Sequence, residues 1–449
     1  MTRTDRPAAE FRYVERAFDA ASATAHLRFA LDAEHFEERI TFLSGPATEL
    51  SPARREALDR VLRHLFLAAG VSYWKAGAPR RVVVESEPLG ADDVAFYERL
   101  YAHGLAEFAW TNQLEGWGSP DFDVRDAAVS APVTGLALAG TPLVPVGGGK
   151  DSMVTIDALR ATGHDPALFV VNEVPAITRA LDATGLPRRA VRRRLDPRLM
   201  ELNEHGALNG HIPITAIVSL IALADAILAG RDTVVMSNER SASVPNFTWA
   251  GTDVNHQYSK SLDFERDLRA LVARSMSPDL EYFSLLRPFS ELRIVRHFAR
   301  LDALHHVVTS CNRAFALDET RRGSGWCRDC PKCRFVFLAL AAFVDRARVV
   351  DVFGGDMLAD PTQTDGFLAL LGIDGPKPLE CVGEVEESRA AAQMLSGRSD
   401  WAGAPVLVEL EARLEPAARV PDDELDRLLA TGPEHFVPER YQDALDAVR

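Results

Sequence analysis

The sequence is poor in cysteine, has no long apolar run and carries no excess of positive charge. Its five cysteines are an odd number in 449 residues, which argues for free thiols or a metal site rather than a disulfide framework. No stretch is uncharged for long enough to span a bilayer, and the polar N-terminus lacks the apolar core of a signal peptide. A net charge of -15 disfavours broad binding to nucleic acids or membrane surfaces. We therefore expect a cytoplasmic protein, with an oligomeric state that the sequence leaves open.

Two common nucleotide-binding motifs are also missing. A Walker loop needs Gly-x-x-x-x-Gly-Lys followed by Ser or Thr, and a dinucleotide-binding fingerprint needs Gly-x-Gly-x-x-Gly. The glycine-rich segment Pro145–Ser152 fits neither motif, because Lys150 is followed by Asp151 and no third glycine has the required spacing.

The same segment nevertheless has the properties of a phosphate-binding loop. It reads Pro-Val-Gly-Gly-Gly-Lys-Asp-Ser, between an apolar run and a helical pattern. Glycines allow backbone N–H groups to approach oxyanions, and a helix N-terminus adds free N–H groups and a favourable dipole. Lys150 offers a cation for phosphate, Asp151 an oxygen ligand for Mg²⁺ and Ser152 a hydroxyl donor. We expect the side chains of Lys150 and Asp151 to lie at a solvent-facing site. The predicted nucleotide-binding residues are Gly147, Gly148, Gly149, Lys150, Asp151 and Ser152. An ordinary turn between strand and helix is the alternative.

The loop is similar to the Ser-Gly-Gly-x-Asp-Ser loop of the PP-loop ATP pyrophosphatases, which cleave ATP between its α and β phosphates and adenylate a substrate. It departs from that pattern at Gly147, where the family usually has serine, so that one hydroxyl donor is missing. The resemblance implies ATP and Mg²⁺ as cofactors. It also implies a parallel-sheet core of the adenine nucleotide alpha hydrolase-like type.

The pattern along the chain predicts an α/β protein with three domains. Residues 1–138 combine strand-like segments with a helical pattern over Pro52–Ala69, which indicates an N-terminal α+β domain. Residues 139–345 alternate short apolar runs with helical stretches, as in the βαβ units of a parallel sheet, and would form the catalytic nucleotide-binding domain with the cysteine cluster. Residues 346–449 mix helical runs with proline-rich breaks and are expected to form a helical C-terminal extension.

Within the central domain the apolar runs predict three strands and a long helix. The strands are expected over Leu143–Val146, Ala167–Val171 and Thr233–Met236. The helix is expected over Ile214–Leu228, with Gly230 ending it.

Four cysteines have the spacing of a metal site. Cys327, Cys330 and Cys333 form two successive C-x-x-C pairs, and Cys311 lies sixteen residues before the first of them. Four thiolates can close a tetrahedral zinc site, so we predict structural Zn²⁺ here, whereas an iron-sulfur cluster, a redox pair and unligated thiols remain alternatives. The arrangement is similar to the zinc-binding end of 7-cyano-7-deazaguanine synthases, which are also PP-loop enzymes. Cys381 stands apart and is most simply a buried thiol.

Three polar stretches of the central domain are candidates for a catalytic site. Residues 237–243 follow the third predicted strand, where ligands of open parallel sheets bind. Residues 203–213 precede the long helix, and residues 255–261 form the third stretch. The carboxylate, guanidinium and hydroxyl groups of residues 237–243 suit Mg²⁺ and an anionic substrate, and Lys260 could hold a phosphate or carboxylate. Solvated loops with capping residues are the alternative. The candidate catalytic residues are His211, Glu239, His256 and Lys260, and Arg240 is a candidate for substrate binding.

Together these segments resemble the MurL family. The resemblance rests on residues 146–152, 209–213, 237–243, 254–261 and 326–333. Members of that family are UDP-N-acetyl-muramoyl-L-alanyl-L-glutamate epimerases, which invert the terminal L-glutamate of a peptidoglycan precursor while they convert ATP to AMP and diphosphate with Mg²⁺. The resemblance implies an isomerase of cell-wall biosynthesis with a UDP-muramyl dipeptide as its small-molecule substrate.

Adenylation is chemically useful to an epimerase. The Cα–H next to a carboxylate is very weakly acidic, because deprotonation puts a second negative charge beside the first. An adenylated carboxylate has lost that charge, so the carbanion becomes an enolate that positioned donors stabilise. One or two general bases must then remove and return the proton. The sequence does not rank the four candidate residues for this role.

A cluster of basic residues over 188–194 could hold the anionic substrate. Arg192 and Arg193 are the members that we name as candidate substrate contacts, while an exposed, solvated face is the alternative.

Two other classes of function use the same loop. A PP-loop amide ligase, or an enzyme of the deazaguanine or tRNA-modification type, would be expected to hold a thiol near the adenylated group or to bind RNA. A non-catalytic protein would bind ATP without turnover.

Overall fold

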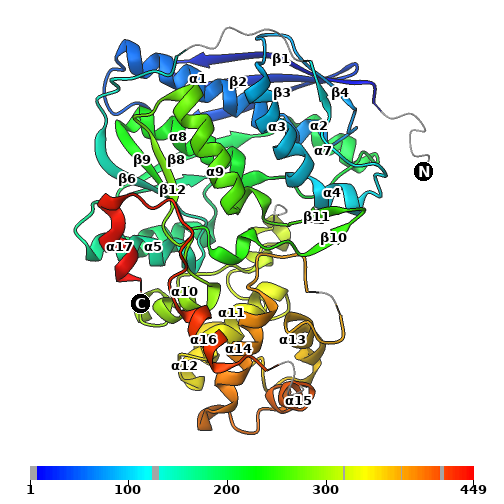
Figure 1. The fold of residues 1–449 in the computed structure, drawn as a ribbon, viewed down its shortest axis with the longest axis vertical. Coiled ribbons are helices and arrows are strands. Elements are labelled where there is room, and N and C mark those ends of the chain that lie inside the picture. Colours follow the sequence, from blue (N-terminus) through cyan, green and yellow to red (C-terminus); the bar gives the residue numbers. More distant parts are fainter. Residues whose placement is uncertain (1–7, 124–130, 317–318, 376, 415–418, 449) are drawn as a thin grey trace.

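The computed structural model describes residues 8–123, 131–316, 319–375, 377–414 and 419–448. In these residues the chain forms a mixed α/β structure around one 10-stranded sheet with the order β12-β9-β6-β7-β8-β3-β2-β1-β4-β5 (Figure 1). The strands of this sheet are β1 (Glu10–Asp19), β2 (Thr24–Leu31), β3 (Glu34–Phe42), β4 (Arg81–Val84), β5 (Asp121–Phe122), β6 (Ala139–Pro145), β7 (Ala167–Val171), β8 (Arg188–Arg194), β9 (Arg231–Met236) and β12 (Glu281–Ser284). A separate hairpin pairs β10 (Phe247–Trp249) with β11 (Thr252–Val254).

Strands β12, β9, β6, β7 and β8, neighbours in that order, form the parallel region of the sheet. Strands β7 and β8 follow β6 on one side of it, whereas β9 and β12 lie on its other side, and all the neighbouring pairs are parallel. After β8 the chain therefore crosses to the other side of β6, and the point where the direction of winding reverses lies between the neighbouring strands β6 and β9. In open α/β sheets such a reversal leaves a crevice at the carboxyl ends of the strands, where ligands bind.

The N-terminal strands extend the same sheet. β3 pairs antiparallel with β8, with Arg39 opposite Arg194 and Phe42 opposite Val191. β2 and β1 continue the antiparallel pairing, and β4 and β5 add parallel strands at the far edge. One sheet thus joins residues on both sides of position 138, while the division of the chain into three domains stays a prediction.

Helices pack against the sheet, and the C-terminal helices form a further group below it in the view of Figure 1. They are α1 (Pro52–Ala69), α2 (Val71–Trp74), α3 (Ala91–Gly104), α4 (Ala106–Thr111), α5 (Lys150–Ala161), α6 (Pro175–Thr184), α7 (Pro197–Glu204), α8 (Ile214–Ala229), α9 (Leu262–Leu271), α10 (Glu291–Phe298), α11 (Pro331–Ala341), α12 (Arg346–Phe353), α13 (Thr364–Leu370), α14 (Val385–Ser396), α15 (Pro405–Arg413), α16 (Asp422–Leu429) and α17 (Gln442–Ala447). None of the helices in the described parts of the chain has the length and apolar character needed to cross a bilayer.

Alternating residues of the parallel strands feed two separate hydrophobic cores. Leu143 and Val234 pack into one core with α1, α8 and α9. Val144 and Val235 point to the other face and pack with α5, α6, α10 and the C-terminal helices. This is the side-chain alternation expected of strands that are buried on both faces.

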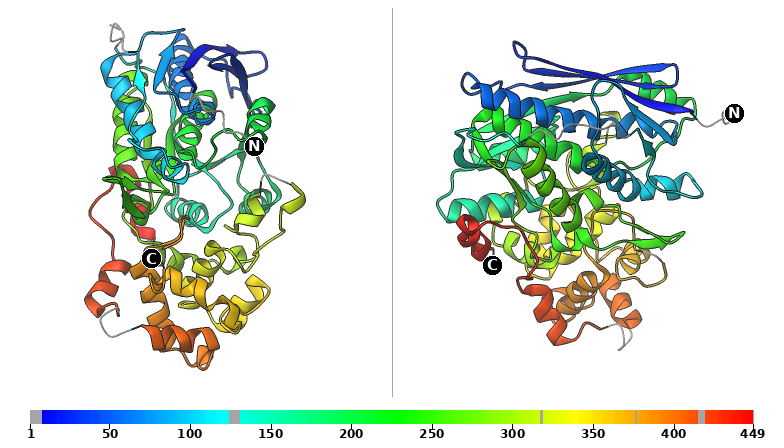
Figure 2. Two further views of the ribbon diagram at one scale, coloured as in Figure 1. Left: turned by 90° about the vertical axis from the view of Figure 1, so that its right-hand side faces the viewer. Right: turned by 45° about the horizontal axis from the view of Figure 1, so that its top comes forward.

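The C-terminal helices lie at the end of the molecule opposite to β1–β4, as both views of Figure 2 show. α11 packs against α12, α13 and α14, and their apolar side chains belong to the second core. The chain then returns to the sheet, where α17 packs against α5. Apart from its 3-10 turns, the regular secondary structure described after residue 345 is helical, in agreement with the expected helical extension.

Several local predictions are confirmed. α1 spans Pro52–Ala69 and β7 spans Ala167–Val171. α8 is buried along most of its length and ends at Gly230, whose φ of 73° is the left-handed conformation that glycine adopts without strain. The predicted basic cluster over 188–194 corresponds to strand β8.

Candidate active site

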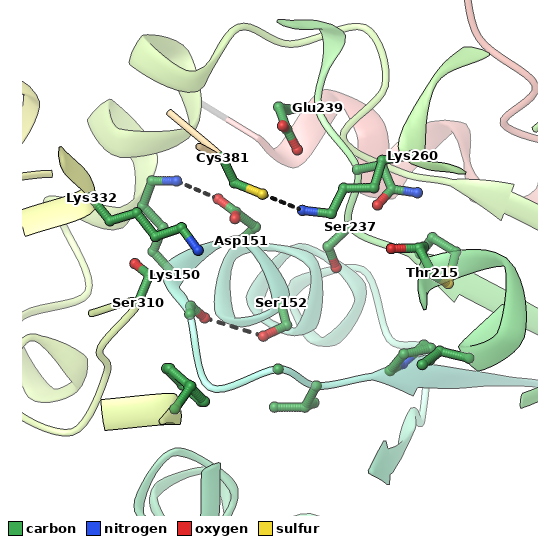
Figure 3. A pocket seen from close by; sticks show the side chains of 18 of the residues that line it. Lys150, Asp151, Ser152, Thr215, Ser237, Glu239, Lys260, Ser310, Lys332 and Cys381 are labelled. Carbon is green, nitrogen blue, oxygen red and sulfur yellow. Dashed lines mark hydrogen bonds and ion pairs between the residues drawn. The ribbon is translucent and has the colours of Figure 1, made fainter. Parts of the chain in front are cut away.

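A cavity of about 660 Å³ opens at the carboxyl ends of β6 and β9, at the reversal of winding. The phosphate-loop candidate forms one side of it (Figure 3). Its other polar lining residues are Thr215, Ser237, Asn238, Glu239, Lys260, Glu291, Ser310, Asn312, Lys332 and Cys381. The sheet topology therefore brings segments far apart in sequence to one site.

The glycine loop between β6 and α5 depends on Gly148. This residue has a φ of +82°, and a Cβ added to it would lie 3.3 Å from both Ile177 and Phe315. Gly149 is extended and precedes α5, and within the described chain no side chain caps the first N–H groups of that helix. Because those N–H groups have no acceptor inside the helix, they are available to an anion.

Lys150 is buried, which contradicts the expectation that it faces the solvent. It is 4% exposed. Its Nζ atom lies 2.6 Å from Oδ1 of Asp151 and also pairs with Glu291, the first residue of α10. Burial alone would lower the pKa of Lys150, but the charges of Asp151 and Glu291 outweigh it and raise that pKa. Lys150 therefore stays protonated and has carboxylate partners before any phosphate arrives.

Glu291 is a residue that the sequence analysis missed. Burial raises the pKa of its carboxyl group well above the usual range, in spite of the opposing effect of Lys150, and Asp151 and Glu239 raise it further. Its only signal in the sequence is its place after Ser290, which caps α10 by accepting a hydrogen bond from Arg293. Three acidic side chains, Asp151, Glu239 and Glu291, thus line one cavity.

A hydroxyl group from another segment lies beside the loop. Ser310 lines the cavity, and its Cβ is 3.9 Å from the position that a Cβ on Gly149 would take. The neighbouring Thr309 donates its backbone N–H to the carbonyl of Gly148 at 3.1 Å. Ser310 therefore lies beside Gly149 of the loop, whereas no atom of the described chain beyond its neighbours in sequence lies within 4 Å of a Cβ added to Gly147.

Cys381 lines the same cavity, and Figure 3 shows it between Asp151 and Lys260. Its sulfur accepts a hydrogen bond from Nζ of Lys260 at 3.4 Å, and Figure 3 shows the two groups pointing toward one another. Burial would raise the pKa of Cys381, but Lys260 and His256 lower it to about 6. Lys260 stays protonated because Cys381, Glu239 and Asp151 outweigh the effect of burial on its pKa. The interpretation of Cys381 as a simple buried thiol overlooks these contacts.

His256 connects this thiol to a carboxylate of α4. Nδ1 of His256 lies 2.5 Å from Oε2 of Glu107, and His256 is close enough to Cys381 for each to shift the pKa of the other. Burial would lower the pKa of His256, but Cys381 and Glu107 raise it to about 9. The His211 ring packs on His256 with centroids 4.3 Å apart, and burial together with His256 lowers the pKa of His211 to about 4. At neutral pH these values describe a protonated His256 beside a neutral His211.

The donor atoms of Glu107, His211 and His256 all lie within 4.8 Å of one another. Such a group could in principle hold a metal ion. The same three groups also have the chemistry of a proton relay, because the two imidazoles and the carboxylate can each take up or release a proton.

The four candidate catalytic residues come together around this region. Glu239 and Lys260 line the cavity itself. His256 reaches it through Cys381, and His211 stacks behind His256. Sequence reasoning did not find Cys381 or Glu107, because neither stands in a motif.

The three candidate substrate-binding arginines lie elsewhere. Arg193 is 8% exposed, with Nε 2.6 Å from Oε1 of Glu38 on β3 and a further hydrogen bond to Ser72. Arg192 is exposed on the same strand, and Arg240 lies next to Gly432, where an added Cβ would be 3.3 Å from its guanidinium group. None of these arginines is among the described residues that line the cavity.

The four clustered cysteines form a compact group beside the cavity. All their sulfur atoms lie within 4.8 Å of one another, with 3.7 Å between Cys327 and Cys333 and 3.5 Å between Cys330 and Cys333. Cys311 accepts a hydrogen bond from the backbone N–H of Cys327. A zinc tetrahedron with Zn–S bonds of about 2.3 Å has sulfur atoms about 3.8 Å apart, so the spacing suits that metal. The group is also joined to the active-site wall, because Asn312 and Lys332 adjoin these cysteines and line the cavity.

Comparison with known proteins identifies relatives along most of the chain. The family model of the MurL N-terminal domain matches residues 2–285, and that of the MurL C-terminal domain matches residues 307–425. A UDP-N-acetyl-alpha-D-muramoyl-L-alanyl-L-glutamate epimerase from Salinispora tropica is 47% identical over 98% of this chain and 96% of its own length. Proteins of the same name from a Micromonospora species and from Xanthomonas oryzae pv. oryzae are 46% and 41% identical, over 97% and 95% of both partners.

Proposed function

The chain belongs to the MurL family, and we propose that it epimerises the terminal L-glutamate of UDP-N-acetyl-alpha-D-muramoyl-L-alanyl-L-glutamate, a peptidoglycan precursor, to D-glutamate. The observation that carries this proposal is the 41% to 47% identity, over nearly the whole chain, to three proteins with that name. The cavity adds a chemical reason, because it combines a phosphate-loop candidate with groups that can move a proton.

In this proposal the glycine loop binds ATP in the manner of a PP-loop. The strand order β8-β7-β6-β9-β12 and the position of the loop at the end of β6 support this assignment. The nucleotide phosphates would take the N–H groups of Gly147–Gly149 and the start of α5, and Lys150 would exchange a carboxylate partner for a phosphate oxygen. Ser310 would supply the hydroxyl donor that Gly147 lacks.

Mg²⁺ would bind on the carboxylate side of the same cavity. Asp151 and Glu239 are the acidic residues best suited to hold it, because both line the cavity and oxygen ligands are what Mg²⁺ prefers. When bound, the ion would offset the negative charge of the phosphates during adenylation. Lys150 and Lys260 contribute positive charge to the same space.

Adenylation of the carboxylate on Cα makes inversion possible. The mixed anhydride with AMP carries no charge on the acyl group, so removal of the Cα proton gives an enolate instead of a doubly charged species. Lys260, which remains protonated, is placed to stabilise the developing oxyanion. After a proton returns to the opposite face, hydrolysis of the anhydride releases the product and AMP, diphosphate having left at the adenylation step.

We further propose that Cys311, Cys327, Cys330 and Cys333 hold one structural Zn²⁺. The mutual distances of the four sulfur atoms and the N–H donor to Cys311 support this assignment. The ion would fix the segments that carry Asn312 and Lys332 to the cavity wall.

The substrate carries a diphosphate and two carboxylates and therefore needs basic contacts beyond the loop. Arg193 is occupied by Glu38, which leaves the exposed Arg192 as the better candidate on β8. Arg240 remains a candidate next to the acidic residues Glu384 and Glu387. A cytoplasmic location stays a prediction.

The test is a reaction of the purified protein with the UDP-muramyl dipeptide, ATP and Mg²⁺ in D₂O. We expect D-glutamate with deuterium at Cα, together with AMP and diphosphate. Substrate labelled with ¹⁸O in the glutamate carboxylates should transfer one ¹⁸O to AMP if an acyl-adenylate forms and water attacks its acyl carbon, whereas attack at phosphorus would leave the label in the carboxylate. Free L-glutamate should react poorly, because the distant UDP-sugar orients the reacting carbon. Inversion that proceeds equally well without ATP would contradict the proposal.

One observation favours a second function. A PP-loop enzyme that transfers sulfur or modifies a base would need a thiol near the adenylated group, and Cys381 lies in the same cavity as the loop. Family membership and the net charge of -15 weigh against an RNA substrate. Diphosphate release that responds to tRNA or a nucleobase, and not to the muramyl dipeptide, would favour this alternative.

A further inference from the structure

Cys381 is the reactive group in the cavity that the proposed adenylation does not use. It lines the same space as Asp151, Glu239 and Lys260, so a substrate that is adenylated at the loop can reach its sulfur. The sulfur accepts a hydrogen bond from Nζ of Lys260 at 3.4 Å, and the nearby His256 lowers its pKa as well.

The groups around this thiol come from five separate parts of the chain. Lys260 and His256 lie in the stretch before α9, Lys332 lies on α11, and Glu107 on α4 contacts His256 from behind. The ring of His211 packs on that of His256, and the charge of Lys75 acts on His211. The positive charges of Lys260, Lys332 and His256 lower the pKa of Cys381, while Glu107 keeps His256 protonated.

A cysteine, a histidine and a carboxylate in hydrogen-bonded sequence form the arrangement that activates catalytic thiols in other enzymes. The carboxylate orients the imidazole, and the imidazolium stabilises the thiolate. Here the 2.5 Å contact between Glu107 and His256 provides the first link, and Lys260, 3.4 Å from the sulfur, and the nearby His256 supply the positive charge that favours the thiolate. The constellation is thus more than an isolated cysteine in a pocket.

We propose that Cys381 is a catalytic residue of the inversion, with its thiolate as the base that removes the Cα proton of the adenylated glutamate. The Cα–H bond breaks, its proton forms an S–H bond with Cys381, and its electron pair becomes the C=C bond of the enolate. A solvent-derived proton then adds to the opposite face of Cα, and the thiol returns its proton to solvent, so that no proton is gained or lost overall. His256 and Glu107 are positioning residues that hold the thiolate. This inference rests on the proposed function.

The thiol suits this role better than the four residues that the sequence suggests. A general base works best when its pKa is near the operating pH, and Cys381 has a pKa of about 6. Lys260 and His256 are protonated at neutral pH and His211 has a pKa of about 4, so that none of the three is a strong, available base there. Glu239 is better placed to bind the metal ion.

The experiment separates the two halves of the reaction in the full-length enzyme. Wild type, Cys381→Ser and Cys381→Ala are each assayed for substrate-dependent diphosphate release and for deuterium incorporation at Cα in D₂O. We expect both variants to lose about 10² or more of the exchange and inversion rates, the usual contribution of a general base. Diphosphate release should fall far less, because the glycine loop and its metal ligands are intact.

A second measurement reports the state of the thiol directly. Alkylation of Cys381 by iodoacetamide, followed by peptide mapping, should show an apparent pKa of about 6 that rises in Glu107→Gln. Substrate with ATP should protect this cysteine from alkylation. A purely structural Cys381 would show neither the low pKa nor the protection.

Three results would overturn the inference. The first is Cα exchange in Cys381→Ser at the wild-type rate, and the second is loss of diphosphate release in the same proportion as exchange. The third is a covalent glutamyl adduct on Cys381, detected in the intact mass of the enzyme during turnover, which would make the thiol a nucleophile. If wild type itself shows no ATP-dependent inversion, the proposed function fails first, and the two failures are thereby distinguished.

Discussion

The two walls of the active-site cavity are built in different ways. The wall that carries the phosphate-loop candidate comes from one short stretch, Gly147–Ser152, whose backbone is set by Gly148 and by the start of α5. The opposite wall combines Cys381 and Lys260, with His256 and Glu107 behind them, from segments that are distant in sequence.

The charges on the two walls differ as well. Lys150 is already paired with Asp151 and Glu291, and we infer that a nucleotide with Mg²⁺ can replace these partners. On the other wall a thiol lies among cationic groups, and the local charge favours its ionised form. We infer that the first wall activates the substrate and the second performs the proton transfer. Variants on the two walls should therefore affect different partial reactions.

The largest effect is expected on the loop wall. Asp151→Asn and Lys150→Ala should each reduce both diphosphate release and inversion by about 10² to 10³, as for the loss of one preorganised charge at a reacting group. Arg160→Ala, at the exposed end of the same helix α5, is the matched control and should behave as wild type. Because Lys150 is buried beside Glu291, the double variant Lys150→Met with Glu291→Gln checks that a folding defect does not cause the loss. Diphosphate release at the wild-type rate in Asp151→Asn would remove the loop from the mechanism.

Removal of the predicted zinc should affect both walls together. We expect about one equivalent of zinc per chain in protein purified without added metal if all four thiolates ligate it. Cys330→Ser should lose the metal, melt at a lower temperature and lose part of both activities, since Lys332 and Asn312 lie next to the cysteines. Cys381→Ser is the matched control and should keep its zinc. Two equivalents of zinc in wild type, with one lost in His211→Ala, would place a second metal ion on Glu107, His211 and His256.

The arginines of β8 test whether a substrate contact lies outside both walls. Arg193→Ala leaves Glu38 buried without its cation and should lower the free energy of unfolding by about 3 to 5 kcal/mol. The exposed Arg192→Ala should change that free energy by less than about 0.5 kcal/mol and, if Arg192 binds the substrate, should raise KM alone. Chemical denaturation and steady-state kinetics of the two variants give these quantities. An unchanged KM in Arg192→Ala would remove this arginine from the substrate site.

The smallest effect is expected from the positioning carboxylate of the thiol wall. Inversion should have a bell-shaped dependence on pH, because the thiolate of Cys381 forms as pH rises through about 6 and the imidazolium of His256 is lost as pH rises through about 9. Cys381 and Glu107 both raise the pKa of His256, and Glu107→Gln removes the second of these charges, so the alkaline limb should move to lower pH and the rate should fall by about tenfold. Glu115→Gln, at an exposed position, is the control and should leave the pH profile unchanged. A pH profile that is identical in Glu107→Gln and wild type would contradict the relay.

The amino-acid sequence by itself determined the features that depend on neighbouring residues. The glycine loop and the helix after it, the C-x-x-C pairs, the strand Ala167–Val171 and the end of α8 at Gly230 follow from local conformational preference and from apolar periodicity. These are properties of a few adjacent residues, so the chain shows them without its fold. The MurL resemblance rested on the same kind of short motif.

Only the tertiary structure decided which distant groups share the cavity and what charge they carry there. Cys381, Glu107 and Glu291 stand in no motif, and their roles arise from the pairing of the parallel strands and from helices that converge at one end of the sheet. In the fold, Lys150 is buried and pairs with Glu291, and Arg193 forms an ion pair with Glu38. A count of basic residues in the sequence treats both side chains as free cations. The physical reason is that pKa and ion pairing depend on burial and on charges within a few ångströms, and the fold brings those charges together from remote positions.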